Sequence, residues 1–210
     1  MRRYDMLKPD DLQGMSGIFA DIMDRRRAAQ LLNGISLARV VLAVPVLALI
    51  LAGPTVRYAY VSAAILFTVA AATDFLDGYL ARRWHCTSDL GVFLDTTADK
   101  LLVTAALVGL LAVGRVWAWV ALIIIGREIA VLGLKAAAAS TGTVVYPSIW
   151  GKLKFNVQFV AIVLAIVRYH ERIGIMYLDQ WAMIVAAVIT VLSAGSYRDQ
   201  FFALLKSVNQ

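Results

Sequence analysis

Six long apolar segments, separated by short polar connections, dominate the pattern of hydrophobic and polar positions along the chain. They lie at about 35–55, 58–82, 92–113, 116–138, 152–169 and 181–198. A helix needs about 20 largely apolar residues to cross the hydrocarbon core of a bilayer. The pattern therefore predicts an all-α integral membrane bundle of six transmembrane helices, in one domain spanning 33–199. The fifth segment gives the weakest signal, because its continuous apolar part covers only 157–167.

The N-terminal segment 1–32 shows a different pattern, a single apolar stripe along one helix. The stripe positions recur at spacings of three and four residues: Met15, Ile18, Phe19, Ile22 and Met23. Such an amphipathic helix, with arginines beside a spanning segment, is typical of a helix that lies in the membrane interface. The alternative is a solvated helix that packs on a partner protein. We expect 1–32 and the tail 200–210 to be cytoplasmic.

Composition and charge support a membrane protein with a defined orientation. The chain is 61% hydrophobic with a mean hydropathy of +0.76, whereas a soluble domain is about half apolar. Its net charge is +6, and most lysines and arginines fall on the side that both termini share. The positive-inside bias places this side in the cytoplasm, where it faces anionic lipid, so no nucleic acid is needed as partner. Cys86 is the single cysteine, which excludes an intrachain disulfide.

Four aspartates carry the strongest chemical signal. Asp74 and Asp77 are three residues apart near the end of the second segment, and Asp95 and Asp99 are four apart near the start of the third. Each pair shares one helix face, and an antiparallel hairpin would bring all four to the same depth. Four carboxylates at a membrane edge repel one another and need a cation. Hard oxygen ligands favour Mg²⁺ or Mn²⁺, and two ions would suit a displacement at phosphorus.

The same segment resembles the signature of the CDP-alcohol phosphotransferase family, D-x2-D-G-x2-A-R-x8-G-x3-D-x3-D, at every fixed position. The matching residues are Asp74, Asp77, Gly78, Ala81, Arg82, Gly91, Asp95 and Asp99. The resemblance implies an enzyme in which an acceptor hydroxyl attacks the β-phosphorus of a CDP-linked donor and CMP leaves. It also implies that the first three aspartates hold metal, while Asp99 is the general base and also touches metal.

The remaining signature residues suit a nucleotide donor. Gly78 lacks a Cβ and lets the backbone approach the nucleotide, and Ala81 keeps the same face narrow. Arg82 offers a planar fork of donors to a pyrophosphate, and Gly91 permits close approach where the second helix of the hairpin begins. The alternative is that the glycines serve packing and that Arg82 is an anchor at the membrane surface.

Further motifs resemble those of bacterial phosphatidylglycerophosphate synthases within this family. Residues 33–39 resemble their N-x-x-T-x-x-R, with Ser36 in place of threonine. Residues 126–129 resemble A-R-E-I, and 150–154 resemble the start of I-G-K-x-K-T, with Phe155 where threonine is usual. This resemblance implies CDP-diacylglycerol as donor, bound also by Asn33 and Ser36, and glycerol 3-phosphate as acceptor. It further implies a homodimer in the bacterial inner membrane with a cytoplasmic active site.

Cations inside the apolar segments support an anionic acceptor. Arg127 and Lys135 are eight residues apart, about 12 Å along one helix face, and cations that deep normally serve a ligand or partner. The predicted acceptor-phosphate site comprises Arg39, Arg127, Lys135, Lys152 and Lys154. The alternatives are that Arg127 pairs with Glu128 for structure and that the lysines are interface anchors.

Three rival functions remain open on the sequence. A phosphatidylinositol-phosphate synthase or a cardiolipin synthase of the same family could use the same cations for its acceptor. A divalent-metal transporter could use the aspartates as an ion path. The absence of internal repeats argues against the transporter, because many transporters are built from repeated halves.

Overall fold

The structure, a computed structural model, describes residues 33–84, 89–140, 149–168 and 172–195. Within these ranges, the structure describes the backbone but not the side chains of some residues: 74–84, 89–93, 139–140, 149–152 and 173. The predicted amphipathic stripe at 15–23, the tail 200–210 and Cys86 also lie outside the described residues. Their assignments stay predictions.

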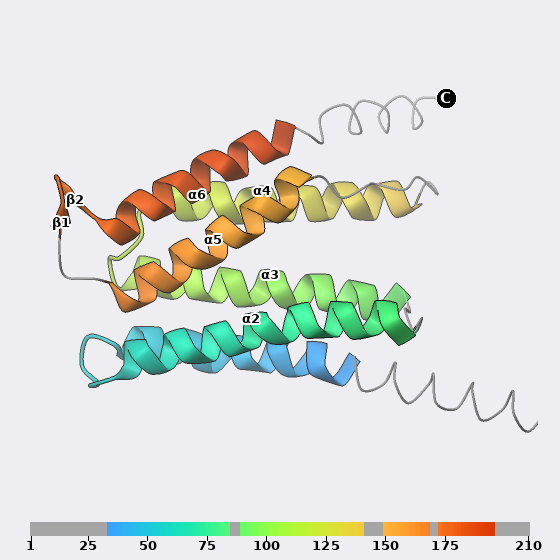
Figure 1. The fold of residues 1–210 in the computed structure, drawn as a ribbon, viewed down its shortest axis with the longest axis horizontal. Helices are drawn as coiled ribbons and strands as arrows, with labels where there is room; N and C mark the ends of the chain where they lie inside the picture. Colours follow the sequence, from blue (N-terminus) through green and yellow to red (C-terminus); the bar gives the residue numbers. More distant parts are fainter. Residues whose placement is uncertain (1–32, 85–88, 141–148, 169–171, 196–210) are drawn as a thin grey trace, which may run out of the picture.

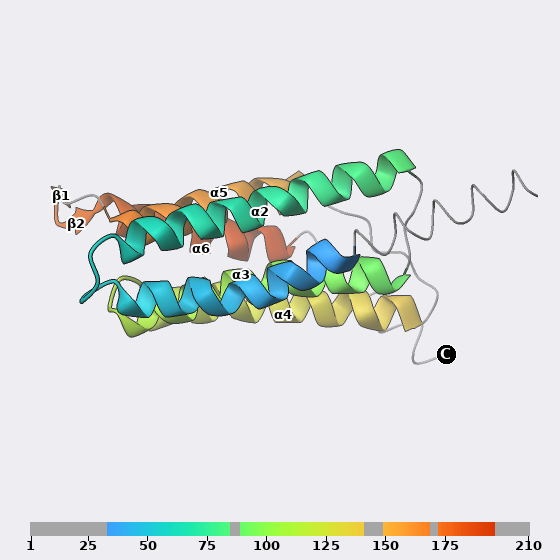
Figure 2. The same ribbon diagram turned by 90° about the horizontal axis from the view of Figure 1, so that it is seen from below.

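Six helices make up almost all of the described chain and run alternately in opposite directions (Figures 1 and 2). They are the first helix, Asn33–Ala52, then α2 (Ala59–Trp84), α3 (Asp89–Ala112), α4 (Ala118–Ser140), α5 (Ile149–Val167) and α6 (Leu178–Gly195). Each helix overlaps one of the six apolar segments. The prediction of an all-helical bundle is therefore confirmed, with one small exception.

The exception is a short hairpin between α5 and α6. Strand β1 (Arg172–Ile173) pairs antiparallel with β2 (Met176–Tyr177), and Gly174 begins the intervening turn at a φ of 68°. Glycine adopts this left-handed conformation without steric cost, which favours it in two-residue hairpin turns. Strands of two residues are too short for an alternating pattern, so this hairpin was not predicted.

Small side chains pack inside the bundle, and large apolar ones cover its surface. Fully buried alanines lie at helix contacts: Ala63, Ala70, Ala106, Ala161 and Ala165. Large side chains that are more than half exposed lie on several helices: Val44, Ile65, Trp119, Leu122 and Leu192. Small residues at helix interfaces and an apolar exterior are typical of bundles surrounded by lipid.

Helix lengths agree with a membrane setting. Among the described residues, two helices are both long and apolar enough to cross a bilayer, the first helix and α6. Helices α2, α3 and α4 contain 26, 24 and 23 residues, or about 35–39 Å at 1.5 Å per residue. A hydrocarbon core is about 30 Å thick. The molecule is therefore consistent with a helical membrane protein.

Close contacts fix how the helices cross. A Cβ added at Gly109 of α3 would lie 3.0 Å from Ile50 Cγ2 and 3.1 Å from Leu47 Cδ1, so the first helix packs directly on this glycine. The rings of Phe67 in α2 and Phe159 in α5 stack with their centroids 5.7 Å apart. These contacts tie α3 to the first helix and α2 to α5.

The end of the bundle where α5 stops and α6 starts is held by charged side chains. Arg168 follows α5 at a φ of 46°, and its backbone N–H donates to the Leu164 carbonyl at 2.8 Å, as in a left-handed helix cap. The Arg115 guanidinium donates to the carbonyls of Ala165 and Ile166. Carbonyls in the last turn of a helix have no partner within the helix, so Arg115 satisfies groups that would otherwise be orphaned.

Arg168 extends this end into a network that we call the arginine clasp, formed by Arg115, Arg168, Asp179 and Tyr60. Arg168 Nε and Nη2 lie 3.2 and 3.1 Å from Asp179 Oδ2, and Nη2 also donates to the Arg115 carbonyl at 3.2 Å. The Arg115 guanidinium stacks 3.4 Å from the Tyr60 ring centroid. The arginine clasp therefore joins α2, the α3–α4 turn, α5 and α6.

Candidate active site

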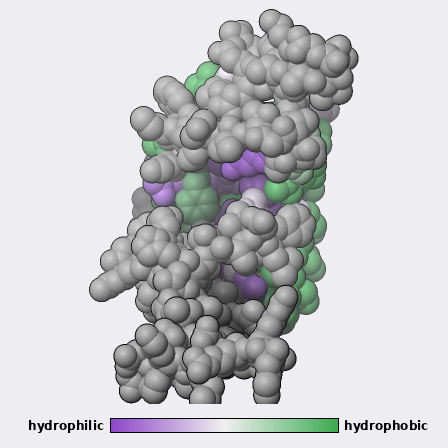
Figure 3. All heavy atoms as spheres, turned by 90° about the vertical axis from the view of Figure 1, so that its right-hand side faces the viewer, coloured by the Kyte–Doolittle hydropathy of each residue, from purple (hydrophilic) through white to green (hydrophobic). Residues whose placement is uncertain are grey.

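The predicted site residues collect at the end of the bundle opposite the arginine clasp. The first helix, α3 and α5 start at this end, and α2 and α4 finish there (Figure 1). Because the helices alternate in direction, motifs far apart in sequence reach the same level. Figure 3 views this end directly, with hydrophilic residues in its middle and hydrophobic surface along its flank.

Arg39 and Asp95 form a buried link between the first helix and α3. Arg39 is 1% exposed, and its Nη1 lies 3.1 Å from Asp95 Oδ1. The Asp95 side chain is still 39% exposed, so it remains accessible to a ligand. Buried Ser36 lies one turn before Arg39, and Asn33 begins the described helix. Arg39 thus contacts a predicted metal ligand, and its predicted role toward the acceptor phosphate stays a prediction.

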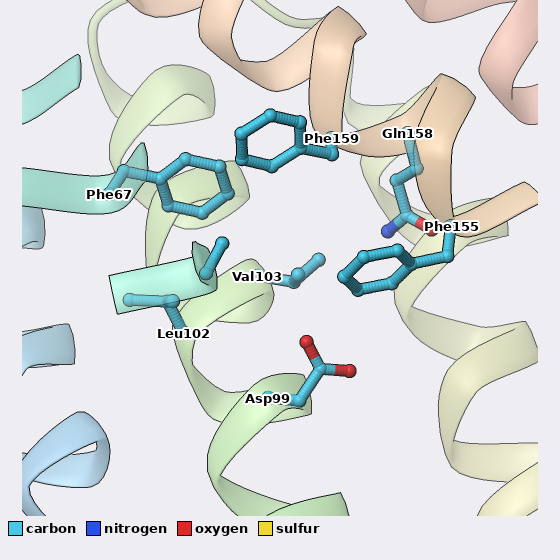
Figure 4. A pocket seen from close by; sticks show the side chains of 8 residues that line it. Phe67, Asp99, Leu102, Val103, Phe155, Gln158 and Phe159 are labelled. Carbon is cyan, nitrogen blue, oxygen red and sulfur yellow. The ribbon is translucent and has the colours of Figure 1, made fainter. Parts of the chain in front are cut away.

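Asp99 lies four residues further along α3 and lines a largely apolar pocket between α2, α3 and α5. Its carboxylate points into the pocket beside the Phe155 ring (Figure 4). The other lining residues are Phe67, Ala71, Leu102, Val103, Gln158 and Phe159. The pocket is small, so it is a narrow apolar crevice beside the Asp99 carboxylate. The side chain of Gln158, a residue only 3% exposed, adds a second polar group to this wall.

A second group of charges surrounds Glu128 on α4, and we call it the Glu128 cluster: Glu128, Lys100, Arg127 and Lys154. Glu128 Oε2 lies 3.0 Å from Lys100 Nζ, while Oε1 accepts a hydrogen bond from Lys154 Nζ and lies 3.6 Å from Arg127 Nη1. Glu128 and Lys154 are each 6% exposed. The cluster therefore joins α3, α4 and α5 through one buried carboxylate.

The two groups of charges lie near enough to act on each other electrostatically. Asp99 interacts electrostatically with Lys100, Lys154 and Glu128 of the cluster, and also with Arg39. Lys135, exposed on α4, interacts with Lys100, Arg127 and Glu128. The structure thus brings Arg127 and Lys154 to one carboxylate. Lys135 is exposed rather than turned into the bundle, and the acceptor role of all three cations stays a prediction.

Other predicted site residues have a described backbone but no described side chain. Asp74, Asp77, Gly78, Ala81 and Arg82 lie in the last part of α2, Gly91 in the first turn of α3, and Lys152 in the first turn of α5. These positions are at the same end of the bundle as Asp99. Their roles stay predictions.

Lys100 was not predicted as a site residue, and Glu128 was predicted only as a structural partner of Arg127. That pair is present, at 3.6 Å, but Glu128 also holds two lysines from other helices. Each residue directly follows a selected one, Asp99 or Arg127. A charged residue inside an apolar helix was the available signal, because such residues normally serve a partner or a ligand.

The carboxylates present fit a divalent metal in their chemistry. Asp95 and Asp99 share a face of α3, and the end of α2 that carries Asp74 and Asp77 lies beside the start of α3 (Figure 1). Carboxylate oxygens are the ligands that Mg²⁺ and Mn²⁺ prefer. Among the side chains that the structure describes, no group of three or more acidic, histidine or cysteine residues converges. The metal assignment therefore stays a prediction.

An apolar helical bundle with carboxylates and cations at one end is typical of a membrane enzyme that handles charged substrates. Residues 30–192 match the family described as CDP-alcohol phosphatidyltransferase. The chain belongs to this family and is an enzyme of this type.

The relatives of the chain include proteins named CDP-diacylglycerol–glycerol-3-phosphate 3-phosphatidyltransferase. The chain is 36% identical to the protein of Bacillus subtilis (strain 168) over 190 residues, which cover 84% of this chain and 97% of the relative. It is 38% identical to the protein of Escherichia coli (strain K12) over 168 residues, which cover 78% of this chain and 90% of the relative.

Proposed function

We propose that this enzyme transfers the phosphatidyl group of CDP-diacylglycerol to glycerol 3-phosphate, which gives phosphatidylglycerol phosphate and CMP. The observation that carries the proposal is the Glu128 cluster, which holds three cations around a carboxylate within electrostatic reach of Asp99, where they would attract an anionic acceptor. A neutral alcohol would not need these cations. The names of the relatives support the same donor and acceptor.

Each part of the site then has a role in the transfer. Arg127, Lys135 and Lys154, together with Lys152 and Arg39, bind the acceptor phosphate. The acceptor hydroxyl gives its proton to Asp99 while its oxygen bonds to the β-phosphorus of the donor. The bond from that phosphorus to the oxygen bridging to CMP breaks, and CMP leaves. Arg82, with Gly78, Ala81, Gly91, Asn33 and Ser36, orients the CDP group.

Two Mg²⁺ or Mn²⁺ ions are part of this proposal. Asp74, Asp77, Asp95 and Asp99 would hold them, and the ions would supply positive charge that stabilises the phosphoryl oxygens during the transfer. The Arg39 guanidinium contacts one oxygen of Asp95 and would fix the orientation of that carboxylate.

We propose that all six helices of 33–199 span the bacterial inner membrane, with the active site on the cytoplasmic side and the chain assembled as a homodimer. The outward-facing large apolar residues and the charge bias of the connections support this arrangement. Residues 1–32 would lie on the cytoplasmic membrane surface and 200–210 would be a cytoplasmic tail.

A competition assay tests the proposed acceptor. Purified enzyme in detergent, given CDP-diacylglycerol with glycerol 3-phosphate, inositol 1-phosphate, phosphatidylglycerol and serine together, is expected to release CMP and to form phosphatidylglycerol phosphate as the main product. The lipid products are separated and identified by mass spectrometry. A main product from inositol 1-phosphate or phosphatidylglycerol would replace the proposed acceptor with one of the rivals. No CMP release with any acceptor, combined with metal uptake by vesicles, would favour the transporter.

The single cysteine tests the orientation. Cys86 lies in the connection that follows α2, at the proposed cytoplasmic end. A thiol reagent that cannot cross membranes is expected to label Cys86 in inverted vesicles and to leave it unlabelled in intact cells. Mass spectrometry of the purified protein measures the labelled fraction, and a Cys86→Ser variant controls for other sites. Labelling in intact cells would place Cys86, and with it the proposed active site, on the outer side of the membrane and would contradict the proposed orientation.

A further inference from the structure

Glu128 is unusual because both of its carboxylate oxygens are engaged by cations from three helices. Oε2 faces Lys100 of α3, and Oε1 faces Lys154 of α5 and Arg127 of its own helix. A buried carboxylate needs compensation by a cation, but burying additional cations around it is costly. Three cations around one carboxylate therefore indicate that the cluster serves more than a structural ion pair.

The charge of the whole group points to the same conclusion. Lys100, Arg127, Lys135 and Lys154 carry four positive charges, against two negative charges on Glu128 and Asp99. These six described groups have a net charge of +2. A phosphate monoester carries about −1.5 to −2 at pH 7, whereas a phosphodiester carries one negative charge. The described cations around Glu128 thus outnumber the described carboxylates, which suits an anionic acceptor better than a neutral alcohol.

We infer that Glu128 is a positioning residue for the acceptor phosphate: it holds Lys100 and Lys154 at the spacing that this phosphate requires, without touching it. A carboxylate would repel a phosphate directly, so Glu128 acts through the ammonium groups that it binds. Lysine side chains are long and flexible, and fixing two of them before the ligand arrives reduces the entropy that binding would otherwise lose. This inference rests on the proposed function.

The alternative role for Glu128 is simple charge compensation. The two roles predict opposite changes in the affinity for the acceptor phosphate when Glu128 loses its charge. Glutamine has nearly the shape of glutamate without its charge. If Glu128 only offsets the lysines, Glu128→Gln leaves a more positive site, and the acceptor phosphate binds more tightly. If Glu128 positions the lysines, the same variant releases them, and the acceptor binds more weakly.

Steady-state kinetics of the full-length enzyme in detergent, with each substrate varied in turn, decides between these roles. Glu128→Gln is expected to raise the acceptor KM about tenfold or more, as loss of charge-assisted contacts does. The KM for CDP-diacylglycerol is expected to change less than about twofold. Glu128→Asp keeps the charge on a side chain one methylene shorter, so its acceptor KM is expected to lie between those of wild type and Glu128→Gln.

The outcomes separate this inference from the proposed function. A lowered or unchanged acceptor KM in Glu128→Gln would overturn the inference, as would a Glu128→Asp enzyme with the wild-type acceptor KM. A parallel rise in both KM values together with a lower unfolding temperature would mean that Glu128 is structural. If Glu128→Gln does not fold, the Glu128→Asp enzyme is compared with wild type instead. If wild type prefers another phosphomonoester, the proposed acceptor fails, and the comparison with that acceptor still tests Glu128.

Discussion

Replacing Asp99 by asparagine is expected to lower the rate of CMP release at least about a hundredfold, the smallest contribution usual for a general base. Asparagine keeps the size of the side chain, so the walls of the pocket formed by Phe67, Phe155 and Phe159 should stay in place. What the variant loses is the carboxylate that, in our proposal, accepts the proton and binds metal. Initial rates at saturating donor and acceptor measure the loss, with Mg²⁺ or Mn²⁺ present.

The same helix supplies a matched control. Asp89 is the first residue of α3 and lies outside the eight fixed signature positions, so Asp89→Asn should keep activity within about twofold. Thermal unfolding of both variants in detergent should match wild type. EDTA should abolish wild-type activity, and added Mg²⁺ or Mn²⁺ should restore it. An Asp99→Asn enzyme that retains a tenth or more of wild-type activity would contradict the assigned role.

Removing the carboxylate of the arginine clasp is expected to cause the largest loss of stability. Asp179 is 2% exposed and binds Arg168 through Nε and Nη2, so Asp179→Ala leaves a largely buried guanidinium without this partner. Breaking a buried ion pair by removing one member costs about 3–5 kcal/mol, and we expect the lower end because Arg168 is partly exposed. For a chain of this length the unfolding midpoint should fall by about 6–12 °C, measured by circular dichroism in detergent.

A nearby exposed arginine provides the comparison for this loss. Arg172 lies on the hairpin, where its guanidinium is 5.1 Å from the Tyr177 ring centroid, and it is exposed. Arg172→Ala should therefore shift the unfolding midpoint by no more than about 2–4 °C, since exposed contacts contribute about 1 kcal/mol or less. Equal shifts for the Asp179 and Arg172 variants would mean that the clasp does not stabilise the bundle.

The helices could be predicted from the sequence because their signal is long and repeated. Each apolar segment has about twenty residues, so errors of a few residues at its ends leave the element recognisable. The hairpin at 172–177 could not be predicted, because two-residue strands depend on one glycine turn and on the neighbouring helix ends. The arginine clasp could not be predicted either, because the sequence indicated for Arg115 and Arg168 only that they are charges on one side of the membrane.

The candidate site could be predicted where its chemistry follows a fixed local spacing. Asp95 and Asp99 are four residues apart, and that spacing alone places them on one helix face. The contact between Arg39 and Asp95 joins residues 56 positions apart, and the one between Lys100 and Glu128 joins residues 28 apart. Such pairs depend on how helices rotate about their own axes, which the periodicity of a single helix does not determine.

The Glu128 cluster has a consequence for how the enzyme is made. The signature at 74–99 is complete once α3 has emerged, but Lys154 comes from α5, two helices later. A nascent chain that has inserted no helix beyond α3 therefore carries every fixed residue of the signature and still lacks Arg127, Lys135 and Lys154. On the proposed function, catalytic competence then arises late in membrane insertion, when the fifth helix reaches its neighbours, because a chain truncated before residue 149 would keep four helices but lack Lys152 and Lys154 of the acceptor site.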